Sequence, residues 1–190
     1  MSEGWESHLI PFFVNLNLNN MSCNQTLSGL ANDCSPSMGG IVEMYAANRA
    51  EIGDVTITDD KVSAITTGTG KFKKYAFARN TGSMSSNYQI NLENGTRFVA
   101  TDVVVVFNRM ETAKRVEVSA LAQNDLILIV KDANGKFWLL GKDEPVKATA
   151  GDGLTGTARA DRNGYSMTFQ DNSKEMPYEV DEKVITGLVG

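Results

Sequence analysis

Apolar runs in the middle of the chain predict a strand, a helix and a β-hairpin in that order. Residues 103–107 are apolar, residues 111–124 are charged, and residues 126–130 are apolar again. Asp132-Ala133-Asn134-Gly135 then turns the chain back into the apolar residues 136–140. Short apolar runs between turn residues are typical of buried strands, and the unbroken valines of the first run predict burial on both faces. This part of the chain forms a scaffold and shows no catalytic chemistry.

The charged segment fits two kinds of secondary structure. Val116, Val118 and Ala120 alternate with polar residues, as in a strand. The alternative is a single helical face, made of Ala113, Val116, Ala120 and Leu121. Lys, Glu, Ala, Leu and Gln favour a helix, and Asn124 is suited to end one. We therefore expect a helix over residues 111–124, with this apolar face in the core.

A long β-hairpin is expected just before this segment. Residues 84–92 alternate between polar and apolar, and residues 96–107 return along them. Asn94-Gly95 suits a type I′ turn between the two strands, because Asn and Gly adopt positive φ at little cost. One face of the first strand is expected to be buried, and its apolar members are Tyr88, Ile90 and Leu92.

Shorter elements are expected on either side. Strands are predicted at residues 41–47, 62–66 and 75–77, with a turn at Asp59-Asp60 and a short helix near residues 26–31. Downstream, Gly151, Gly153 and Gly156 predict a flexible loop. A last hairpin is expected from residues 154–160 and 165–169 around Asn163-Gly164, and residues 176–190 show no helix-length pattern.

Three Asn-Gly turns between strand-like runs define the fold class. They predict a mainly β protein, a β-sandwich or partly open barrel of antiparallel hairpins with one main α-helix. A chain of 190 residues suffices for one well-buried core. We expect an extended N-terminal arm (residues 1–20), a single β domain (residues 21–170) and an extended C-terminal tail (residues 171–190).

Composition and charge exclude several classes of protein. The chain is 42% hydrophobic and 22% charged, which is ordinary for a globular protein, and its net charge is −5. Gripping nucleic acid needs clustered Lys and Arg, so this acidic balance argues against it. No window approaches the roughly 18 apolar residues of a membrane span, and the start of the chain lacks the basic region of a secretory signal. We expect the protein to be made and folded in a cytoplasm, with Cys23 and Cys34 reduced.

Residues 151–156 match the G-x-G-x-x-G pattern, and Asp171 lies twenty residues after its first glycine. In a dinucleotide site this pattern follows a strand and opens a helix, whose N–H groups meet the pyrophosphate. Here a short segment with Thr155, Thr157 and another Asn-Gly turn follows. The better interpretation is a glycine-rich loop.

Two other patterns match the beginning of a calcium loop without completing it. They are Asp132-x-Asn134-Gly135 and Asp161-x-Asn163-Gly164, and neither has the bidentate Glu at the twelfth position. Aspartate side chains that stabilise turns explain both patterns. No metal or cofactor is therefore expected at either turn.

No catalytic or metal-binding residues are predicted. Cys23 and Cys34, with His8 as the only histidine, do not form a structural zinc site, and a lone His8 disfavours most nucleophile–base pairs. A hydrolase would need carboxylates that converge, and it ranks third, behind the two functions described below. The candidates, which are usually solvated turn residues, are Asp59, Asp60, Asp125, Asp143, Asp152 and Asp181.

The order of the elements carries a resemblance to a known family. A long hairpin at residues 84–107, a helix at residues 111–124 and further hairpins resemble the tail-tube fold of tailed bacteriophages. Two segments are also similar to small virion proteins of phages of gut Bacteroidales, including the crAss-like group. The first comprises residues 23–30 with Asp33-Cys34 to Ile41, and the second comprises residues 125–141 followed by 156–169. The resemblance covers about residues 20 to 170.

The resemblance implies a structural virion protein with no catalytic residues. Such a subunit belongs to a tail tube or to a ring at the neck or tail, and its partners are copies of itself in a hexameric or dodecameric ring and neighbouring virion proteins. DNA passes through the channel without specific binding, and no cofactor is involved. We expect the hairpin at residues 84–107 to line the channel and to join neighbouring subunits.

A monomeric binding module is the alternative from another class. A β-sandwich that binds carbohydrate or a receptor uses exposed aromatic side chains, and the candidates are Trp5, Trp138 and Tyr165. Oligomeric state separates the two functions, because the ring requires association and the binding module does not.

Overall fold

The computed structural model describes residues 27–190. The chain divides into two units, Met1–Ser35 and Pro36–Gly190. Within the first unit, residues 27–35 have no regular secondary structure, so the short helix predicted near residues 26–31 is wrong over its described part. The left-handed φ of +77° at Gly29 is incompatible with a helix there. The predicted arm at residues 1–20 lies outside the described residues.

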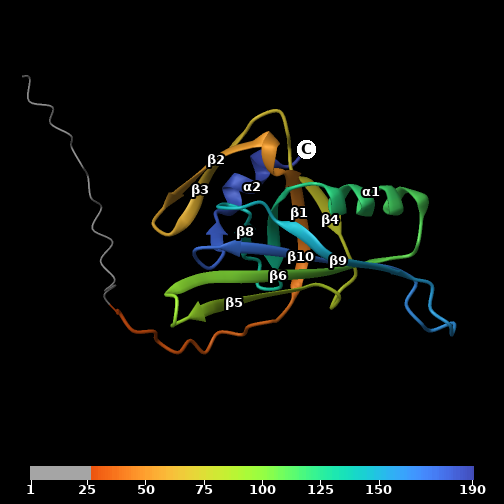
Figure 1. The fold of residues 1–190 in the computed structure, drawn as a ribbon, viewed down its shortest axis with the longest axis horizontal. Coiled ribbons are helices and arrows are strands. Elements are labelled where there is room, and N and C mark those ends of the chain that lie inside the picture. The colour runs from red at the N-terminus through yellow and green to blue at the C-terminus, as the bar shows by residue number, and fades with distance from the viewer. Residues whose placement is uncertain (1–26) are drawn as a thin grey trace, which may run out of the picture. The chain divides into compact units, whose positions relative to one another are not determined.

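The second unit contains a seven-stranded sheet in the order β2-β3-β11-β8-β7-β1-β4. All neighbours in this sheet are antiparallel except β11 and β3, which are parallel. Its strands are β1 (Ile41–Asn48), β2 (Ile52–Thr58), β3 (Lys61–Thr67), β4 (Lys73–Ala76), β7 (Leu126–Asp132), β8 (Phe137–Leu140) and β11 (Tyr178–Val180), and a 3-10 turn, η1 (Arg49–Glu51), joins β1 to β2. Figure 1 shows these strands in the half of the unit that also carries the C-terminus.

A four-stranded antiparallel sheet in the order β5-β6-β10-β9 forms the second layer. Its strands are β5 (Ser83–Asn91), β6 (Thr96–Asn108), β9 (Lys147–Leu154) and β10 (Gly164–Ser173). The helices are α1 (Thr112–Gln123) and α2 (Glu182–Leu188). The predicted fold class, mainly β with one main helix, is confirmed.

Burial on both faces of β7 places it at the centre of two hydrophobic cores. Leu126, Leu128 and Val130 point into the core between the two sheets, where they meet side chains such as Val103 and Phe169. The alternate residues Ile127 and Ile129 point into a second core, on the opposite face, with residues of β2, β3 and α2. A strand covered on both faces is apolar without interruption, which explains the sequence of residues 126–130.

The valine run of β6 behaves differently from the prediction. Val103 and Val105 are fully buried in the core between the sheets, but Val104 is only half-buried. Burial therefore alternates along most of this strand, and only at residues 105–107 is it continuous. The prediction of burial on both faces is therefore confirmed at residues 105–107 and wrong at Val104, which is only partly covered by the described residues.

The helix prediction is confirmed, but its predicted buried face is wrong. α1 ends where expected, since the side-chain amide and the N–H of Asn124 both donate to the Ala120 carbonyl, at 2.9 and 3.2 Å. Of the four predicted core residues only Leu121 is buried, whereas Ala113, Val116 and Ala120 are exposed. Val118 packs against the core instead. α1 thus contacts the core mainly through its C-terminal half.

The predicted turns lie where expected, but the type I′ geometry occurs at Asp59-Asp60 and not at the Asn-Gly pairs. Asp59 and Asp60 both have positive φ, +51° and +58°, between the paired residues Thr58 and Lys61, as in a type I′ turn. At Asn134-Gly135 only Gly135 has positive φ, and at Asn94-Gly95 only Gly95 does. The two Asn-Gly turns are therefore not type I′. The chain reverses through longer loops, as between the paired residues Asn91 and Thr96.

Predictions near the C-terminus are also wrong, among them the strand expected at residues 154–160, of which only Leu154 lies in a strand. Gly151 and Gly153 lie inside β9 rather than in a loop, and residues 155–163 form the loop that precedes β10. The segment expected to be an extended tail contains β11 and α2. Asp181 caps α2 by accepting a hydrogen bond from the Lys183 N–H at 3.0 Å. The strand β2, which begins at Ile52, was also not predicted.

Candidate functional site

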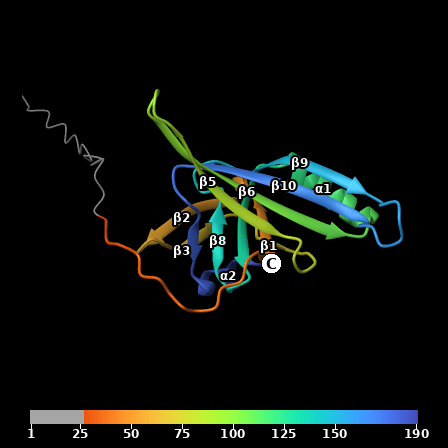
Figure 2. The same cartoon turned by 90° about the horizontal axis from the view of Figure 1, so that it is seen from below.

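The hairpin of β5 and β6 extends beyond the four-stranded sheet. β10 pairs with β6 only as far as Val99, which lies opposite Ser173. Beyond that point β5 and β6 pair with each other alone, up to Asn91 and Thr96. Figure 2 shows the end of this hairpin projecting away from the other strands. We call residues 89–98 the free ribbon.

Apolar side chains at the free ribbon are exposed to solvent. The face of β5 predicted to be buried is not: Tyr88 and Ile90 are exposed, and Leu92, at the turn, is 91% exposed. Phe98 of β6 is also exposed, but it lies opposite Gln89 and therefore on the other face of the ribbon. Alternation did predict that Tyr88 and Ile90 share one face. It did not reveal that the core ends at Val99, so nothing in the described chain covers that face farther out.

A polar row crosses the buried face of the same sheet. Thr101 is fully buried, and its hydroxyl donates to Ser86 Oγ at 2.8 Å. Asp171 lies opposite Thr101 in the register of β10 and β6 and is almost completely buried. These polar side chains interrupt the apolar core just before the free ribbon begins.

Asp171 is an unusual carboxylate. Its Oδ1 has no hydrogen-bond partner among residues 27–190, and burial raises the pKa of Asp171 to about 6. The nearby polar groups of Ser173 and the Gly141 backbone oppose this rise, whereas the nearby charges of Asp143 and Glu144 add to it. In the sequence, Asp171 stood out only through its spacing from the G-x-G-x-x-G pattern, and no local pattern predicted that this carboxylate is buried.

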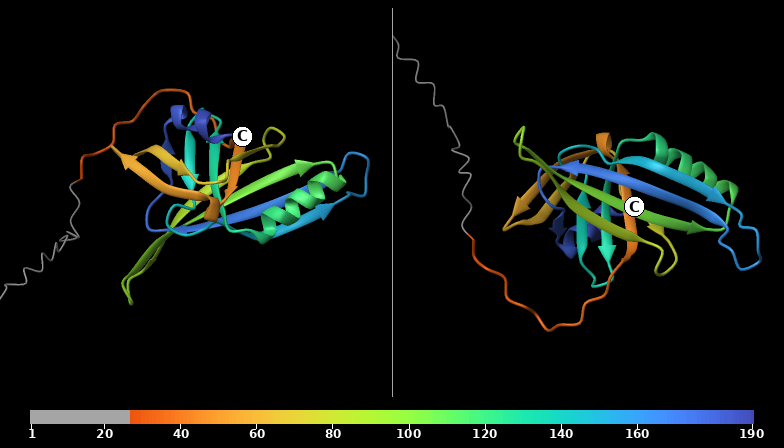
Figure 3. Two further views of the ribbon diagram at one scale, coloured as in Figure 1. Left: turned by 90° about the horizontal axis from the view of Figure 1, so that it is seen from above. Right: turned by 60° about the horizontal axis from the view of Figure 1, so that its bottom comes forward.

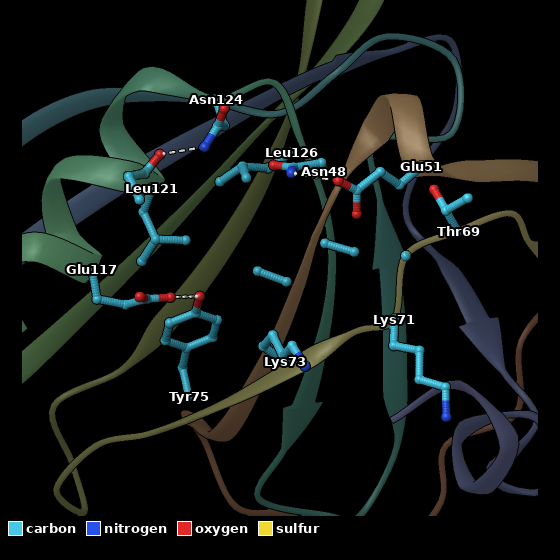
Figure 4. A pocket seen from close by; sticks show the side chains of 14 residues that line it. Asn48, Glu51, Thr69, Lys71, Lys73, Tyr75, Glu117, Leu121, Asn124 and Leu126 are labelled. Atoms are coloured by element: carbon cyan, nitrogen blue, oxygen red, sulfur yellow. Dashed lines mark hydrogen bonds between the residues drawn. The ribbon is translucent and has the colours of Figure 1, made fainter. Parts of the chain in front are cut away.

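A polar cleft opens between β1 and α1, as Figure 4 shows. β4 pairs with β1 only at residues 43–46, so Ala47 and Asn48 have no partner on that side, and a space of about 510 Å³ remains. Lys71 and Lys73 line one side and Glu117 of α1 the other. The cleft carries both signs of charge and a floor of small apolar side chains.

A second, more apolar cleft of about 470 Å³ lies between β4 and α1. Tyr75, Phe107, Val118 and Leu121 supply its apolar surface. Its rim carries ammonium groups, those of Lys73, Lys74 and Lys114. We call this space the apolar cleft.

The hydroxyl of Tyr75 donates to Glu117 Oε1 where the two clefts meet, a contact drawn in Figure 4. Burial and the carboxylate of Glu117 raise the pKa of Tyr75. Tyr75 is therefore a neutral hydrogen-bond donor that ties β4 to α1, and it is not poised as a base.

The sequence patterns weighed for calcium are turn structures. Asp132 Oδ1 accepts from the N–H groups of Asn134 and Lys136, both at 2.8 Å, and its Oδ2 accepts from Trp138 Nε1 at 3.1 Å. Asp161 Oδ2 accepts from the N–H groups of Ala158 and Thr157, which lower the pKa of this carboxyl. The first four residues of the G-x-G-x-x-G pattern belong to β9, which leads into a loop and not into a helix.

The candidate carboxylates do not converge. Asp125 pairs with Lys147, Asp143 with Lys142 and Asp152 with Arg162, while Asp59 and Asp60 form a turn and Asp181 caps α2. Within residues 27–190, no three His, Cys, Asp or Glu side chains are placed to hold a metal ion. Cys34 is a free, exposed thiol, and Cys23 and His8 lie outside the described residues.

Neither α1 nor α2, the two helices of residues 27–190, has the length and apolar character needed to span a membrane.

The aromatic candidates are not the exposed ones. Trp138 and Tyr165 are half-buried and pack against the core, and Trp5 lies outside the described residues. Among residues 27–190 the exposed aromatic side chains are instead Phe98 of the free ribbon and Tyr88 at its base.

The chain has no counterpart in three comparisons with known proteins. No family model matches it, and no curated protein and no solved structure is significantly similar to it.

Proposed function

We propose that this chain is a structural virion protein of a tailed bacteriophage that forms a ring around the DNA channel of the tail or neck. The observation that carries the proposal is the free ribbon, residues 89–98, with its exposed apolar side chains. A two-stranded ribbon is marginally stable alone in water, and large exposed apolar patches mark surfaces that bind a partner. A homo-oligomeric subunit provides such a partner in its neighbour.

The outer face of the four-stranded sheet has the chemistry of a channel wall. On this face the strands that flank β6 carry mainly hydroxyls and amides, from Ser85, Asn87 and Gln89 of β5 and Ser166, Thr168 and Gln170 of β10, whereas β6 itself contributes Phe98, Val104 and Val106. Asp102 lies among them and accepts from Gln170 Nε2 at 3.0 Å. A surface poor in Lys and Arg lets DNA slide, because it forms few ion pairs with phosphates.

The edges of this sheet also favour association. β5 and β9 each pair with one neighbour only among the strands of residues 36–190. Open strand edges invite pairing with another chain, and a closed ring satisfies such edges by symmetry. The acidic charge, the absence of a converging catalytic set in the described part and the ribbon all suit a non-enzymatic subunit.

The monomeric binding module has less support. Its carbohydrate- or receptor-binding surface was expected at Trp138 and Tyr165, which are half-buried against the core. The polar cleft offers a space for a small ligand, but its opposite charges and small apolar floor indicate no particular ligand class.

Light scattering coupled to size exclusion tests the proposal directly. We expect multimers of the 20.6 kDa chain that appear as closed rings by negative-stain microscopy. A monomer at every accessible concentration contradicts the ring and favours the binding module.

A further inference from the structure

The free ribbon and the apolar cleft lie at opposite ends of the four-stranded sheet. The views of Figure 3 and Figure 1 agree that the turn between β5 and β6 is far from α1, which forms one wall of the cleft. The ribbon of one chain therefore does not reach its own cleft. Two different patches at the two ends of one subunit are the requirement for head-to-tail association, which closes into a ring when the rotation between subunits permits.

The two patches match in polarity. At the ribbon, Leu92 is 91% exposed at the tip and Ile90 is 59% exposed beside it. The apolar cleft measures about 470 Å³, within the range of pockets that enclose a ligand, and its surface is aromatic and aliphatic. Inserting the tip covers apolar surface on both subunits at once, which is the main favourable term in association.

The charges also match in part. Glu93 follows Leu92 at the tip, and the cleft is lined by Lys73, Lys74 and Lys114 together with one carboxylate, that of Glu117, which accepts from the Tyr75 hydroxyl. Lys74 already pairs with Glu43 at 2.6 Å, and Lys114 donates to the Asn108 carbonyl at 2.6 Å and lies 3.7 Å from a Glu111 oxygen. An ammonium group has three donors, so both lysines retain capacity for a carboxylate.

We propose that the tip of the free ribbon of one subunit, with Leu92 as its anchor, inserts into the apolar cleft between β4 and α1 of the next copy of this chain. This inference rests on the proposed function, because it assigns the two halves of the subunit contact in the ring. It is a heterologous contact, so each subunit uses its ribbon on one neighbour and its cleft on the other.

Crosslinking tests the pairing in the full chain. In a background with Cys23→Ser and Cys34→Ser, Leu92→Cys is combined with Ala76→Cys, an exposed residue of the cleft. A short bismaleimide should then produce a ladder of covalent multimers larger than dimers. Each single variant should give no ladder. The matched control combines Leu92→Cys with Asp54→Cys, an exposed residue of β2 away from the cleft, and should give none.

A second variant separates this inference from the ring itself. Leu92→Asp should raise the concentration at which half of the chains are multimeric by about tenfold or more, as expected for an interface anchor. Met176→Asp, at an exposed apolar residue outside the cleft, should leave it unchanged. Normal rings from Leu92→Asp, or a ladder as strong from the control pair, overturn the docking but not the ring. A wild-type chain that never associates overturns both.

Discussion

Tyr88 and Val99 lie directly opposite each other in the register of β5 and β6, yet Tyr88 is 50% exposed and Val99 is fully buried. On its other side Val99 pairs with Ser173, the last residue of β10. On one side of this cross-strand pair, β5, β6 and β10 lie side by side over the core. On the other side, only β5 and β6 remain and form the two-stranded ribbon. Changes on either side of this pair are expected to have different consequences.

Removing the ribbon should separate folding from association. Replacing residues 89–98 by Asn-Gly, so that a tight turn joins Tyr88 to Val99, leaves the buried residues Val99 and Thr101 in place. We expect a folded monomer with a melting temperature close to that of the wild type and no rings by negative-stain microscopy. Rings of normal size from this variant would place the interface elsewhere.

Leu121 should be the residue of α1 most sensitive to charge. It is 4% exposed within the core between the sheets, so Leu121→Asp buries an unpaired carboxylate and should lower the free energy of unfolding by about 3 kcal/mol or more. Val116 is 53% exposed on the same helix, and Val116→Asp is the matched control. Urea denaturation measures both, and similar losses for the two variants would show that burial of Leu121 is not the cause.

Asp171 should make stability depend on pH between about pH 4 and pH 6. Its pKa is raised from 3.8 to about 6 in the folded state, so the folded chain binds a proton more readily than the unfolded chain across this window. Stability from this group is therefore greatest at low pH, falls as the pH rises to about 6, and is constant above it.

The variant Asp171→Asn removes this titration. It should increase the free energy of unfolding at pH 7 by on the order of 1–3 kcal/mol relative to the wild type and abolish the decrease between pH 4 and pH 6. Urea denaturation at several pH values measures the effect. Asp161→Asn is the control. Hydrogen bonds lower the pKa of Asp161, so this variant should decrease rather than increase the free energy of unfolding at pH 7. An unchanged pH profile for Asp171→Asn would contradict the assignment.

Gly135 should be the sensitive residue of the turn between β7 and β8. Its φ is +85°, which a β-branched side chain adopts only with strain, so Gly135→Val should cost about 1 kcal/mol or more in stability. No atom lies within 4 Å of a Cβ placed there, so the cost arises from the backbone and not from a clash. Gly135→Asn should cost less, because Asn tolerates this conformation. Equal losses for Val and Asn would point to a cause other than φ.

Sequence alone predicted the elements that carry strong local signals. The uninterrupted apolar run at residues 126–130 is β7, since a strand covered on both faces has no polar position. The propensities of the charged segment predicted α1. The face of α1 was missed because the helix turns Val118 and Leu121 towards the core, so that Val116 and Ala120 are exposed.

The other elements depend on contacts between distant segments. β11 has three residues, and β3 and β8 hold it on either side, which no local pattern reveals. α2 has seven residues, and Ile185 and Leu188 are buried only because the second core lies beneath them. The exposed face at Tyr88 and Ile90 was predicted to be buried, because alternation identifies a face but not how far along the strand the core extends.

The separation between core and ribbon also bears on how the sequence can change over time. Residues 89–98 contribute little to the core, so folding places little constraint on substitutions there. The main constraint on them is the surface that the ribbon contacts. Residues 99–107 of the same strand are constrained by every neighbour in the core. A single hairpin thus contains a half that must be preserved and a half that is free to follow a changing partner.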